Sequence, residues 1–391
     1  MRKAALWGIG ILIGVSACRA LLPEEYAFNL PLRGILFARG APAETELQKA
    51  IELPDGFRIS VYAEVVRPRM LRFTETGDLL VSSPRMGAVY CVTADTDGDG
   101  SADAVTELVA GLDDPHGLDL RDGWLYVGEE WGVSRARYDA AQGLIEGELE
   151  PVIEGLPVGG HHFYKTIGFG PDGWLYVNNG SSCNVCVEDD ERSATIMRFR
   201  PDGSGGEIYA RGLRNSVGFD WHPQTRAMYA TDNGRDLLGD DFPPCELNRI
   251  ERGKTYGWPF ANGDRIPDPD LGAGRASAIE ESIPPVHGFV AHTAPLGMTF
   301  YRGSAFPTKY RDQVFVAQHG SWNRTRKSGY RVVLVEGLGS GDPVENDFAG
   351  GWEVDERVSG RPVDIKTGPD GALYVSDDFA NVIYKIEYLG G

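Results

Sequence analysis

The sequence predicts an all-β fold, a six-bladed β-propeller, on three observations. An apolar triplet follows a short polar turn six times along the chain, about every 50 residues apart from one longer interval. The repeated segments are rich in β-branched and aromatic residues, as strands are. The chain also holds 51 Gly and 24 Pro, which interrupt helical patterns. The triplets begin at Leu79, Leu125, Leu175, Met228, Val314 and Leu373.

Each repeat is interpreted as one blade of four antiparallel strands, so residues 51–391 are expected to form a single propeller. We expect the N-terminal and C-terminal strands to share a blade, because closing the ring removes exposed sheet edges. The longest interval between triplets contains residues 233–295, which are rich in Gly, Pro and Asp. This composition predicts an elaborated loop on one face, where propellers build their sites.

The composition describes a globular, acidic chain. Hydrophobic residues make up 42% of it, which is enough to bury a large core. The 38 Lys and Arg against 57 Asp and Glu give a formal net charge of −19. Such a charge repels nucleic acids and anionic membrane surfaces. We therefore expect no nucleic-acid partner.

The first residues have the pattern of an export signal. Arg2 and Lys3 precede an apolar run over Ala4–Ala17, shorter than the roughly 20 residues that span a bilayer. The run ends in Val-Ser-Ala-Cys, which resembles the bacterial lipobox and places Cys18 at the new N-terminus. We expect residues 1–17 to be a lipoprotein signal peptide, Cys18 to be lipidated, and residues 18–50 to be a tether. The alternative is an ordinary signal peptide with an incidental Cys.

This pattern also predicts a location. The protein is expected to be exported, anchored to the bacterial membrane only through its N-terminal lipid, and to face the periplasm. An oxidising compartment favours disulfides. Cys183 and Cys186 are therefore expected to form a short-loop disulfide instead of a redox or metal pair, since no second Cys-x-x-Cys is present to complete a zinc site. Cys91 and Cys245 are either buried singly or paired with each other.

An acidic loop has the spacing of a calcium site. Carboxylates stand at loop positions 1, 3, 5 and 9, with Gly at position 6 for the sharp turn. Thr106 takes the twelfth position, where calcium loops carry Glu. We expect a structural Ca²⁺ here; the alternative is a solvated acidic turn. The four carboxylates are those of Asp95, Asp97, Asp99 and Asp103.

Several motifs, in order along the propeller region, resemble one known family: the sorbosone dehydrogenase branch of the soluble, pyrroloquinoline-quinone (PQQ)-dependent sugar dehydrogenases. The resemblance implies a propeller that oxidises a sugar or a sugar-derived aldehyde, with PQQ and Ca²⁺ as cofactors. The motifs are Gly-His-His-Phe at 160–163, Gly-Pro-Asp-Gly at 170–173, Gly-Ser-Ser-Cys-Asn at 180–184, Gly-Leu-Arg-Asn at 212–215, Tyr-Gly-Trp-Pro at 256–259 and His-Gly-Ser-Trp-Asn-Arg at 319–324.

His162 is the candidate general base, at the place where the resemblance implies the catalytic His of the family. Oxidation of a hydroxyl needs a base for the O–H proton, and imidazole suits this at neutral pH. On a strand, neighbouring side chains point to opposite faces, so only one of His161 and His162 can face the site. The alternative is a His that holds a loop by hydrogen bonds.

The cofactor residues are implied by the resemblance. PQQ carries three carboxylates and an ortho-quinone, which call for Arg side chains and a cation near the reacting carbonyl. Arg214 and Asn215 match a pair that contacts the quinone oxygens, and Arg361 matches an Arg that binds a carboxylate. Backbone carbonyls of Asn233, Gly234 and Arg235 match those that hold the activating Ca²⁺.

The chain departs from the glucose-oxidising branch at two basic positions. Val363 stands where that branch has a second Arg, and Gly320 stands near the place of a Lys. We expect His319 or Arg324, in the loop after the fifth triplet, to substitute for the missing charge.

Two other classes of function remain open. One is a calcium-dependent hydrolase of the lactonase kind, which would use Asn179, Asp232 and Asn233 around a central metal. The other is a noncatalytic propeller that binds a glycan or a protein. The absence of the two basic family residues would favour this alternative. The dehydrogenase is the preferred prediction, with a soluble or membrane-bound electron acceptor.

Overall fold

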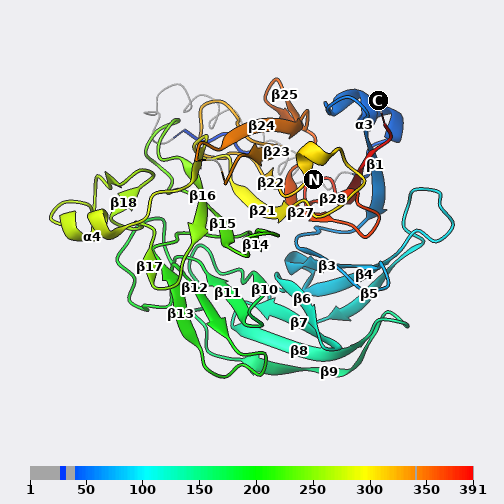
Figure 1. The fold of residues 1–391 in the computed structure, drawn as a ribbon, viewed down its shortest axis with the longest axis horizontal. Coiled ribbons are helices and arrows are strands. Elements are labelled where there is room, and N and C mark those ends of the chain that lie inside the picture. The colour runs from blue at the N-terminus through cyan, green and yellow to red at the C-terminus, as the bar shows by residue number, and fades with distance from the viewer. Residues whose placement is uncertain (1–26, 32–39, 340, 391) are drawn as a thin grey trace, which may run out of the picture.

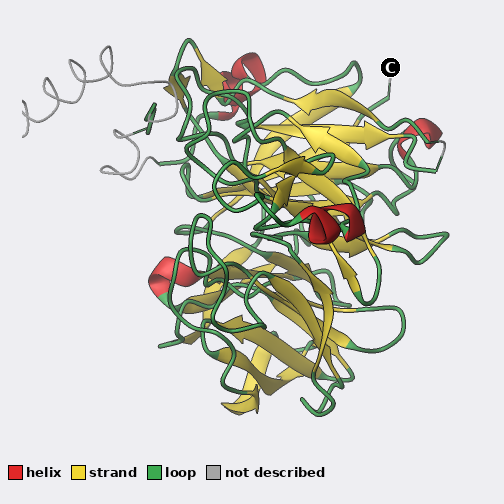
Figure 2. Ribbon diagram, turned by 90° about the vertical axis from the view of Figure 1, so that its left-hand side faces the viewer, coloured by secondary structure: helices red, strands yellow, loops and turns green. Residues whose placement is uncertain are grey.

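The fold is a six-bladed β-propeller, as predicted (Figure 1). A computed structural model describes residues 27–31, 40–339 and 341–390. Six sheets, each built on four antiparallel strands, are arranged around a central axis. Figure 2 shows that strands fill the body of the molecule and that the helices are short.

The blades follow the chain order, each from its inner to its outer strand. Blade 1 is β2 (Leu71–Phe73), β3 (Leu79–Ser83), β4 (Ala88–Thr93) and β5 (Ala104–Ala110). Blade 2 is β6 (Leu118–Arg121), β7 (Trp124–Glu129), β8 (Gly132–Asp139) and β9 (Leu144–Ile153). Blade 3 is β10 (Ile167–Phe169), β11 (Leu175–Asn179), β12 (Thr195–Phe199) and β13 (Glu207–Arg211), with β17 (Lys254–Thr255) added in parallel to its edge.

Blade 4 is β14 (Phe219–Trp221), β15 (Met228–Asp232), β16 (Cys245–Ile250) and β20 (His287–Phe289). Blade 5 is β21 (Pro295–Phe300), β22 (Val314–Gln318), β23 (Arg331–Glu336) and β24 (Val344–Ala349). Blade 6 is β27 (Pro362–Thr367), β28 (Leu373–Asp377), β29 (Val382–Tyr388) and β1 (Phe57–Glu64). Two hairpins, two helices and two 3₁₀ turns complete the described part: β18 (Ala261–Asn262) with β19 (Ile266–Pro267), β25 (Glu353–Val354) with β26 (Arg357–Val358), α3 (Glu44–Ala50), α4 (Ala276–Glu281), η2 (Pro84–Met86) and η3 (Thr308–Tyr310).

The six apolar triplets are the second strands of the six blades. In β3, β11, β15, β22 and β28 every residue is buried. A second strand pairs with a strand on each side and is covered by neighbouring blades on both faces. Its sequence is therefore a continuous apolar run. Burying each Val or Leu there contributes about 1.5–3 kcal/mol. This burial explains why the second strand carries the clearest repeat in the sequence.

The ring closes as predicted, through a blade that both ends of the chain share. Strand β1 pairs antiparallel with β29, from Phe57 opposite Tyr388 to Glu64 opposite Val382. The other three strands of this blade come from the C-terminal end of the chain. Blade 6 therefore joins residues more than three hundred positions apart in the sequence.

Three inner-strand carboxylates connect successive blades in pairs. Asp119 on β6 accepts a hydrogen bond from the backbone N–H of Phe169 in blade 3, with N to O at 2.6 Å. Asp220 on β14 accepts from Phe300 in blade 5 at 2.8 Å. Asp364 on β27 accepts from Leu71 in blade 1 at 2.9 Å. Blades 2 and 3, 4 and 5, and 6 and 1 are thus linked in the same way around the axis.

The long interval between triplets is only partly loop, which corrects the prediction for residues 233–295. It contains β16 and β20, which are regular strands of blade 4. Between them lies an insertion, residues 251–286, with β17, the hairpin β18–β19 and α4. Figure 1 places α4 and β18 at the outer edge of the molecule, away from the ring centre. The segment from Asn233 to Pro244, in contrast, supplies carbonyl groups to the site described below.

The described parts of the predicted tether contact the propeller. The backbone N–H of Asn29 donates to the carbonyl of Trp322 at 2.8 Å, and Phe28 stacks on the Trp322 ring. Leu47 of α3 is buried against the core that blades 5 and 6 share. The predicted signal peptide and Cys18 lie outside the described residues. In the described ranges, no helix is long and apolar enough to cross a membrane.

Candidate active site

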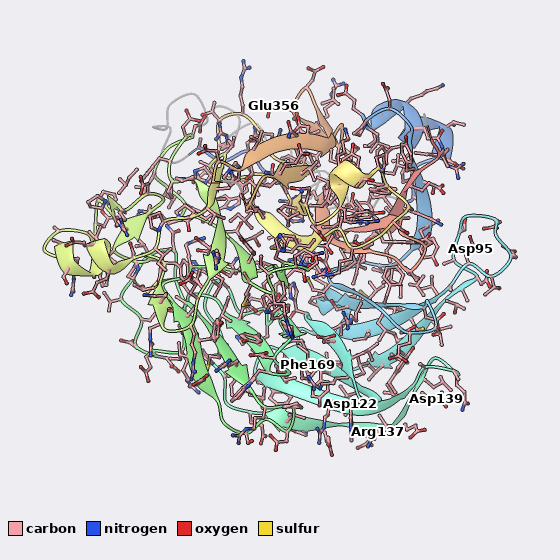
Figure 3. All side chains as sticks on the ribbon, in the orientation of Figure 1. Asp95, Asp122, Arg137, Asp139, Phe169 and Glu356 are labelled. Atoms are coloured by element: carbon pink, nitrogen blue, oxygen red, sulfur yellow. A yellow bond between two sulfur atoms is a disulfide. The ribbon has the colours of Figure 1, made fainter. Side chains whose placement is uncertain are left out.

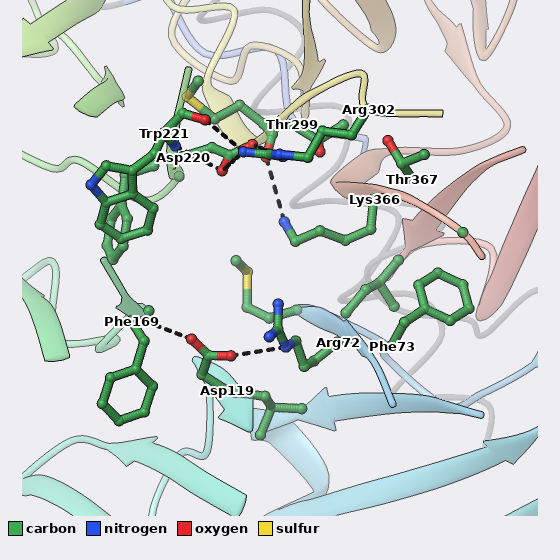
Figure 4. A pocket seen from close by; sticks show the side chains of 18 of the residues that line it. Arg72, Phe73, Asp119, Phe169, Asp220, Trp221, Thr299, Arg302, Lys366 and Thr367 are labelled. Atoms are coloured by element: carbon green, nitrogen blue, oxygen red, sulfur yellow. Dashed lines mark hydrogen bonds and ion pairs between the residues drawn. The ribbon is translucent and has the colours of Figure 1, made fainter. Parts of the chain in front are cut away.

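The inner strands run in the same direction, so the central channel has two different mouths. The inner strands and the turns that follow them line the larger cavity, with a volume of about 790 Å³ (Figure 4). Its charged side chains are paired: Arg72 with Asp119 and Arg302 with Asp220, both at 2.8 Å. Lys366 likewise contacts Asp364 at 2.7 Å. With each cation neutralised, this mouth offers no excess of positive charge to an anionic cofactor.

The other mouth has the opposite electrostatic character. Segments that precede the inner strands, together with the connections after the second strands of blades 1 and 6, line a cavity of about 200 Å³ there. Four arginines and one carboxylate, that of Asp378, contribute to its lining, together with Tyr164. In a protein with a net charge of −19, this local excess of positive charge marks a site for an anion. The four arginines are Arg67, Arg69, Arg85 and Arg361.

His162 lies two residues before Tyr164, on the segment that leads into β10. Its Nδ1 is 3.1 Å from the carbonyl oxygen of Ser181 and 2.9 Å from the Ser181 hydroxyl. A carbonyl can only accept, so Nδ1 carries the proton and Nε2 keeps its lone pair. Burial and the positive charge of Arg214 lower the pKa of His162 to about 3. The ring is therefore neutral at physiological pH, as a proton acceptor must be.

His161 and His162 lie in the loop before β10, not on a strand, so the prediction that strand neighbours face opposite ways does not apply to them. His161 is exposed to solvent, whereas His162 is half-buried. The two rings are 6.1 Å apart and almost perpendicular. His162 is thus the one of the pair that belongs to the buried network.

Arg214 is buried, and all five of its side-chain N–H groups have acceptors inside the protein. Nε donates to the carbonyl of Asn184 at 3.0 Å, and Nη1 donates to the carbonyls of Asn233 and Gly234 at 3.1 and 3.0 Å. Nη2 donates to Oδ1 of Asn184 at 2.9 Å and to Asp236 at 3.0 Å. No N–H is left for a cofactor, so Arg214 acts on the site through its charge and by fixing these loops.

The calcium predicted at residues 233–235 does not fit this arrangement. Two of its expected ligands, the carbonyl oxygens of Asn233 and Gly234, accept hydrogen bonds from the Arg214 guanidinium. A divalent cation at these oxygens would stand directly beside a buried positive charge. The Arg235 side chain is paired with Asp268 at 2.8 Å and with Asp270 at 2.9 Å. The carbonyls of Asn233 and Gly234 are therefore arranged around the Arg214 guanidinium and not around a metal ion.

Asp232 organises the backbone next to Arg214. One carboxylate oxygen accepts from the N–H of Arg214 at 3.0 Å, and the other accepts from the N–H of Asn215 at 2.7 Å and from the Ser216 hydroxyl at 3.1 Å. Burial raises the pKa of Asp232 to about 6. Both oxygens are used to shape the loop, so Asp232 is not available as the central metal ligand that a lactonase-type hydrolase requires.

His319 and Arg361 form a second network around Asp378. Nε2 of His319 is 2.9 Å from Oδ1 of Asp378, and Arg69 contacts the same carboxylate at 3.1 Å. Arg361 donates to the carbonyls of His319 and Gly320 at 3.0 and 2.9 Å. Burial and the charge of Arg361 lower the pKa of His319 to about 4. His319 is therefore neutral at pH 7 and does not replace a missing Lys charge.

Arg324 does not supply that charge to the mouth. Its guanidinium donates to the carbonyls of Asp240 and Ala291 and pairs with Asp241 at 3.1 Å. These contacts hold it against the 240–241 loop, and it is not among the residues that line the arginine-rich cavity.

The packing explains why the two basic family positions are apolar here. Val363 is completely buried and packs with Val217 and Leu296, where a guanidinium would lack partners. Gly320 has a φ of +96°, and a Cβ there would come within 2.4 Å of the Tyr330 ring. Neither position can carry a cation without rearrangement.

The acidic loop between β4 and β5 is well separated from both mouths. Carboxylate oxygens of Asp95, Asp97 and Asp99 lie within 4.8 Å of one another. Asp103 instead binds the backbone N–H and the hydroxyl of Thr96, so it stands apart from this cluster. Thr106 lies inside β5. Figure 3 shows Asp95 on a loop that projects from the rim of the propeller.

The cysteines are assigned by the structure. Cys183 and Cys186 form the predicted disulfide. Cys91 and Cys245 are both free and buried, so they do not pair with each other.

Sequence reasoning missed the residues that give the mouth its charge. Arg67 and Arg69 lie on the connection that leads into blade 1, and Arg85 lies in η2. The resemblance named no residue in this region, and Asp378 and Tyr164 were not singled out either. One signal was present: Arg69 stands just before the inner strand of its blade, as Arg361 does in blade 6. Aligning the repeats on their inner strands would have placed these two arginines together.

Comparison with known proteins now identifies the family. The family model described as Glucose / Sorbosone dehydrogenase matches residues 128–384. A PQQ-dependent pyranose dehydrogenase of Coprinopsis cinerea is 32% identical, with 90% of this chain and 56% of that protein covered. The aldose sugar dehydrogenase YliI of Escherichia coli is 26% identical, with 67% of this chain and 72% of that protein covered.

The fold agrees with these sequence matches. The holo form of the PQQ domain of the Coprinopsis cinerea pyranose dehydrogenase superposes with a TM-score of 0.73 at 21% identity, covering 86% of this chain and 97% of that domain. The propeller, the order of its motifs and the family match over most of the ring lead to one conclusion: the chain belongs to the glucose/sorbosone dehydrogenase family of sugar dehydrogenases.

Proposed function

We propose that the protein is a PQQ-dependent dehydrogenase that oxidises a sugar or a sugar-derived aldehyde at the arginine-rich mouth. The observation that carries this proposal is the neutral His162, whose Nδ1 proton is held by the Ser181 carbonyl and whose Nε2 is left as a base. The relatives named for PQQ-dependent pyranose oxidation and for aldose oxidation support the same chemistry.

The residues at this mouth suit an aromatic tricarboxylate. Arg361, Arg69, Arg67 and Arg85 would hold its carboxylates, because guanidinium groups pair with carboxylates in bidentate geometry. Nε and Nη2 of Arg361 bind carbonyls, whereas its Nη1 has no hydrogen-bond acceptor among the described residues. When bound, PQQ supplies the two-electron acceptor that the substrate carbon requires.

The catalytic work of the chain itself is proton transfer and charge stabilisation. Nε2 of His162 takes the proton of the substrate hydroxyl, while Ser181 fixes the ring and its tautomer. The buried charge of Arg214 favours negative charge that develops nearby. Arg214 also keeps His162 unprotonated, since two positive charges in one buried network repel each other.

Reconstitution tests the proposal. The purified chain is incubated with PQQ and Ca²⁺, and aldoses and aldonic aldehydes are screened with an artificial electron acceptor. We expect acceptor reduction that depends on both the quinone and the sugar. Hydrolysis of lactones without quinone would favour the hydrolase alternative, and glycan binding without either activity would favour the noncatalytic alternative.

A further inference from the structure

The four-residue ring closed by the Cys183–Cys186 disulfide lies against the proposed catalytic residues. Asn184 is inside this ring, in the sequence Cys-Asn-Val-Cys. Its carbonyl and its Oδ1 accept from Arg214 at 3.0 and 2.9 Å. Its Oδ1 also accepts from the N–H of Asp236 at 2.8 Å, and its Nδ2 donates to the Asp236 carbonyl at 3.0 Å. One residue of the ring thus makes four hydrogen bonds to the Arg214–Asp236 pair.

The same ring also contacts the support of His162. The Ser181 hydroxyl donates to the carbonyl of Cys183 at 2.7 Å, and that hydroxyl is 2.9 Å from Nδ1 of His162. The ring therefore touches the base on one side, through Ser181, and the buried cation on the other side, through Asn184.

Because Arg214 is buried, losing its contacts with Asn184 would be energetically costly. Arg214 is 3% exposed, and Asn184 accepts two of its five N–H groups. A buried guanidinium that loses acceptors without gaining water is strongly disfavoured, so Arg214 must move if Asn184 moves. Residues 183–190 contain no regular helix or strand, so the backbone there has no other ladder of hydrogen bonds to fix it. The disulfide supplies this constraint by tying Cys183 covalently to Cys186, with their Cα atoms 6.2 Å apart.

We propose that the Cys183–Cys186 ring is a redox-sensitive clamp that makes Asn184 a positioning residue for Arg214 and, through Ser181, for His162. A dithiol reductant adds two electrons and two protons to the S–S bond and leaves two thiols, while the dithiol itself becomes a disulfide. Both cysteines are partly exposed, so a small dithiol reaches them. The open form releases Asn184, and turnover falls. The effect on turnover rests on the proposed function, but the release of Arg214 does not.

The direct test therefore uses the apoprotein, without quinone or sugar. Hydrogen exchange of the Arg214 Nε–H is measured by NMR in ¹⁵N-arginine-labelled protein, with the signal assigned by its loss in Arg214→Lys. We expect exchange about tenfold faster in the Cys183→Ser/Cys186→Ser variant, as for the loss of one net hydrogen bond. In situ reduction of the wild type with dithiothreitol should give the same result and covers the case that the double variant fails to fold. An unchanged exchange rate in the reduced protein would overturn the clamp.

A matched control lies in the same loop. The Ser182 hydroxyl donates to Glu188 at 2.6 Å, with no bond to Arg214 or Asp236. Ser182→Ala should therefore leave the Arg214 exchange rate at the wild-type value, whereas Asn184→Ala should raise it. Equal effects of the two substitutions would show general loosening of the loop and would also overturn the proposal.

A double-mutant cycle in the reconstituted protein extends the test to catalysis. Asn184→Ala should lower kcat about tenfold in the wild type and have almost no further effect in the Arg214→Lys background, because its influence passes through Arg214. Additive losses would contradict a positioning role. If no quinone-dependent activity exists at all, the proposed function fails, while the NMR result still decides on the clamp.

Discussion

Asp364 on β27 accepts a hydrogen bond from the backbone N–H of Leu71 on β2, with N to O at 2.9 Å, across the junction where the last blade meets the first. Its other oxygen accepts from Ile365 and from Lys366 at 2.9 and 2.7 Å. Asp364 is completely buried, so these partners are what make its charge tolerable. The ring is thus closed both by strand pairing in blade 6 and by this carboxylate.

Removal of this carboxylate should be costly. We expect Asp364→Ala to destabilise the protein by about 1–3 kcal/mol, because it leaves the buried Leu71 N–H without an acceptor. Denaturant unfolding followed by fluorescence measures the effect. Asp347→Ala is the control, since Asp347 pairs with Arg331 in solvent with 66% of its side chain exposed, and it should change stability little. Similar losses for both variants would contradict the role given to Asp364.

His162→Ala should lower kcat about 10²- to 10⁴-fold while quinone binding is retained, because a general base is lost but no cofactor ligand. Steady-state kinetics and quinone titration separate the two effects. His161→Ala is the matched control and should keep nearly full activity, as its side chain is exposed. An essential His161 beside a dispensable His162 would show that the base has been misassigned.

The pH profile should reflect the pKa of His162. A base must be unprotonated to act, and the pKa of His162 is lowered from 6.5 to about 3 by burial and Arg214. The activity that depends on His162 is therefore present at neutral pH and is lost only as the pH falls toward that low value. The measurement is kcat/KM from pH 8 down to the limit of stability. A fall in kcat/KM near pH 6.5 would instead show that the imidazole of His162 is solvated, which would contradict the prediction.

The acidic rim loop remains a proposed calcium site. Substitution of Asp95 and Asp99 by Asn should lower the melting temperature in calcium buffer and leave it nearly unchanged in chelator, since a ligand stabilises only the state that binds it. Differential scanning calorimetry in both buffers provides the comparison. Equal shifts with and without calcium would identify these carboxylates as surface charge.

Lipidation of Cys18 is a prediction from the sequence alone. Cys18→Ser should release soluble protein or leave an unprocessed precursor, because no thiol remains to receive the acyl chains that hold the protein on a membrane. Fractionation of the expressing cells into membrane and soluble material reports the outcome. Membrane partition identical to that of the wild type would refute the anchor.

The fold could be predicted from the sequence because the second strand of each blade is buried and is therefore a recognisable apolar run. Residues such as Leu79–Ser83 and Leu373–Asp377 are buried along their whole length, and their period reveals the ring. The strands within residues 233–295 were harder to predict. Strand β20 returns to blade 4 only after a long insertion, so the sequence gives no local sign that Leu247 pairs with His287.

The site was predictable only where a motif marked it. His162, Arg214 and Arg361 were named as candidates in this way, and their roles stay predictions. Arg69 was missed, because its partner Asp378 lies 309 residues away and only ring closure brings them together. The role of Arg214 was also misjudged in part, since sequence cannot show that all five of its N–H groups are used internally.

The most direct test of the proposed chemistry is a single turnover without any electron acceptor. Quinone-loaded protein is mixed with an aldose that proved active in the screen, and the absorbance of the bound cofactor is followed. We expect conversion to the reduced spectrum with one sugar oxidised per chain, and at least a hundredfold slower conversion in His162→Ala. Tight quinone binding with no spectral change on addition of any sugar or aldehyde would contradict the proposed function.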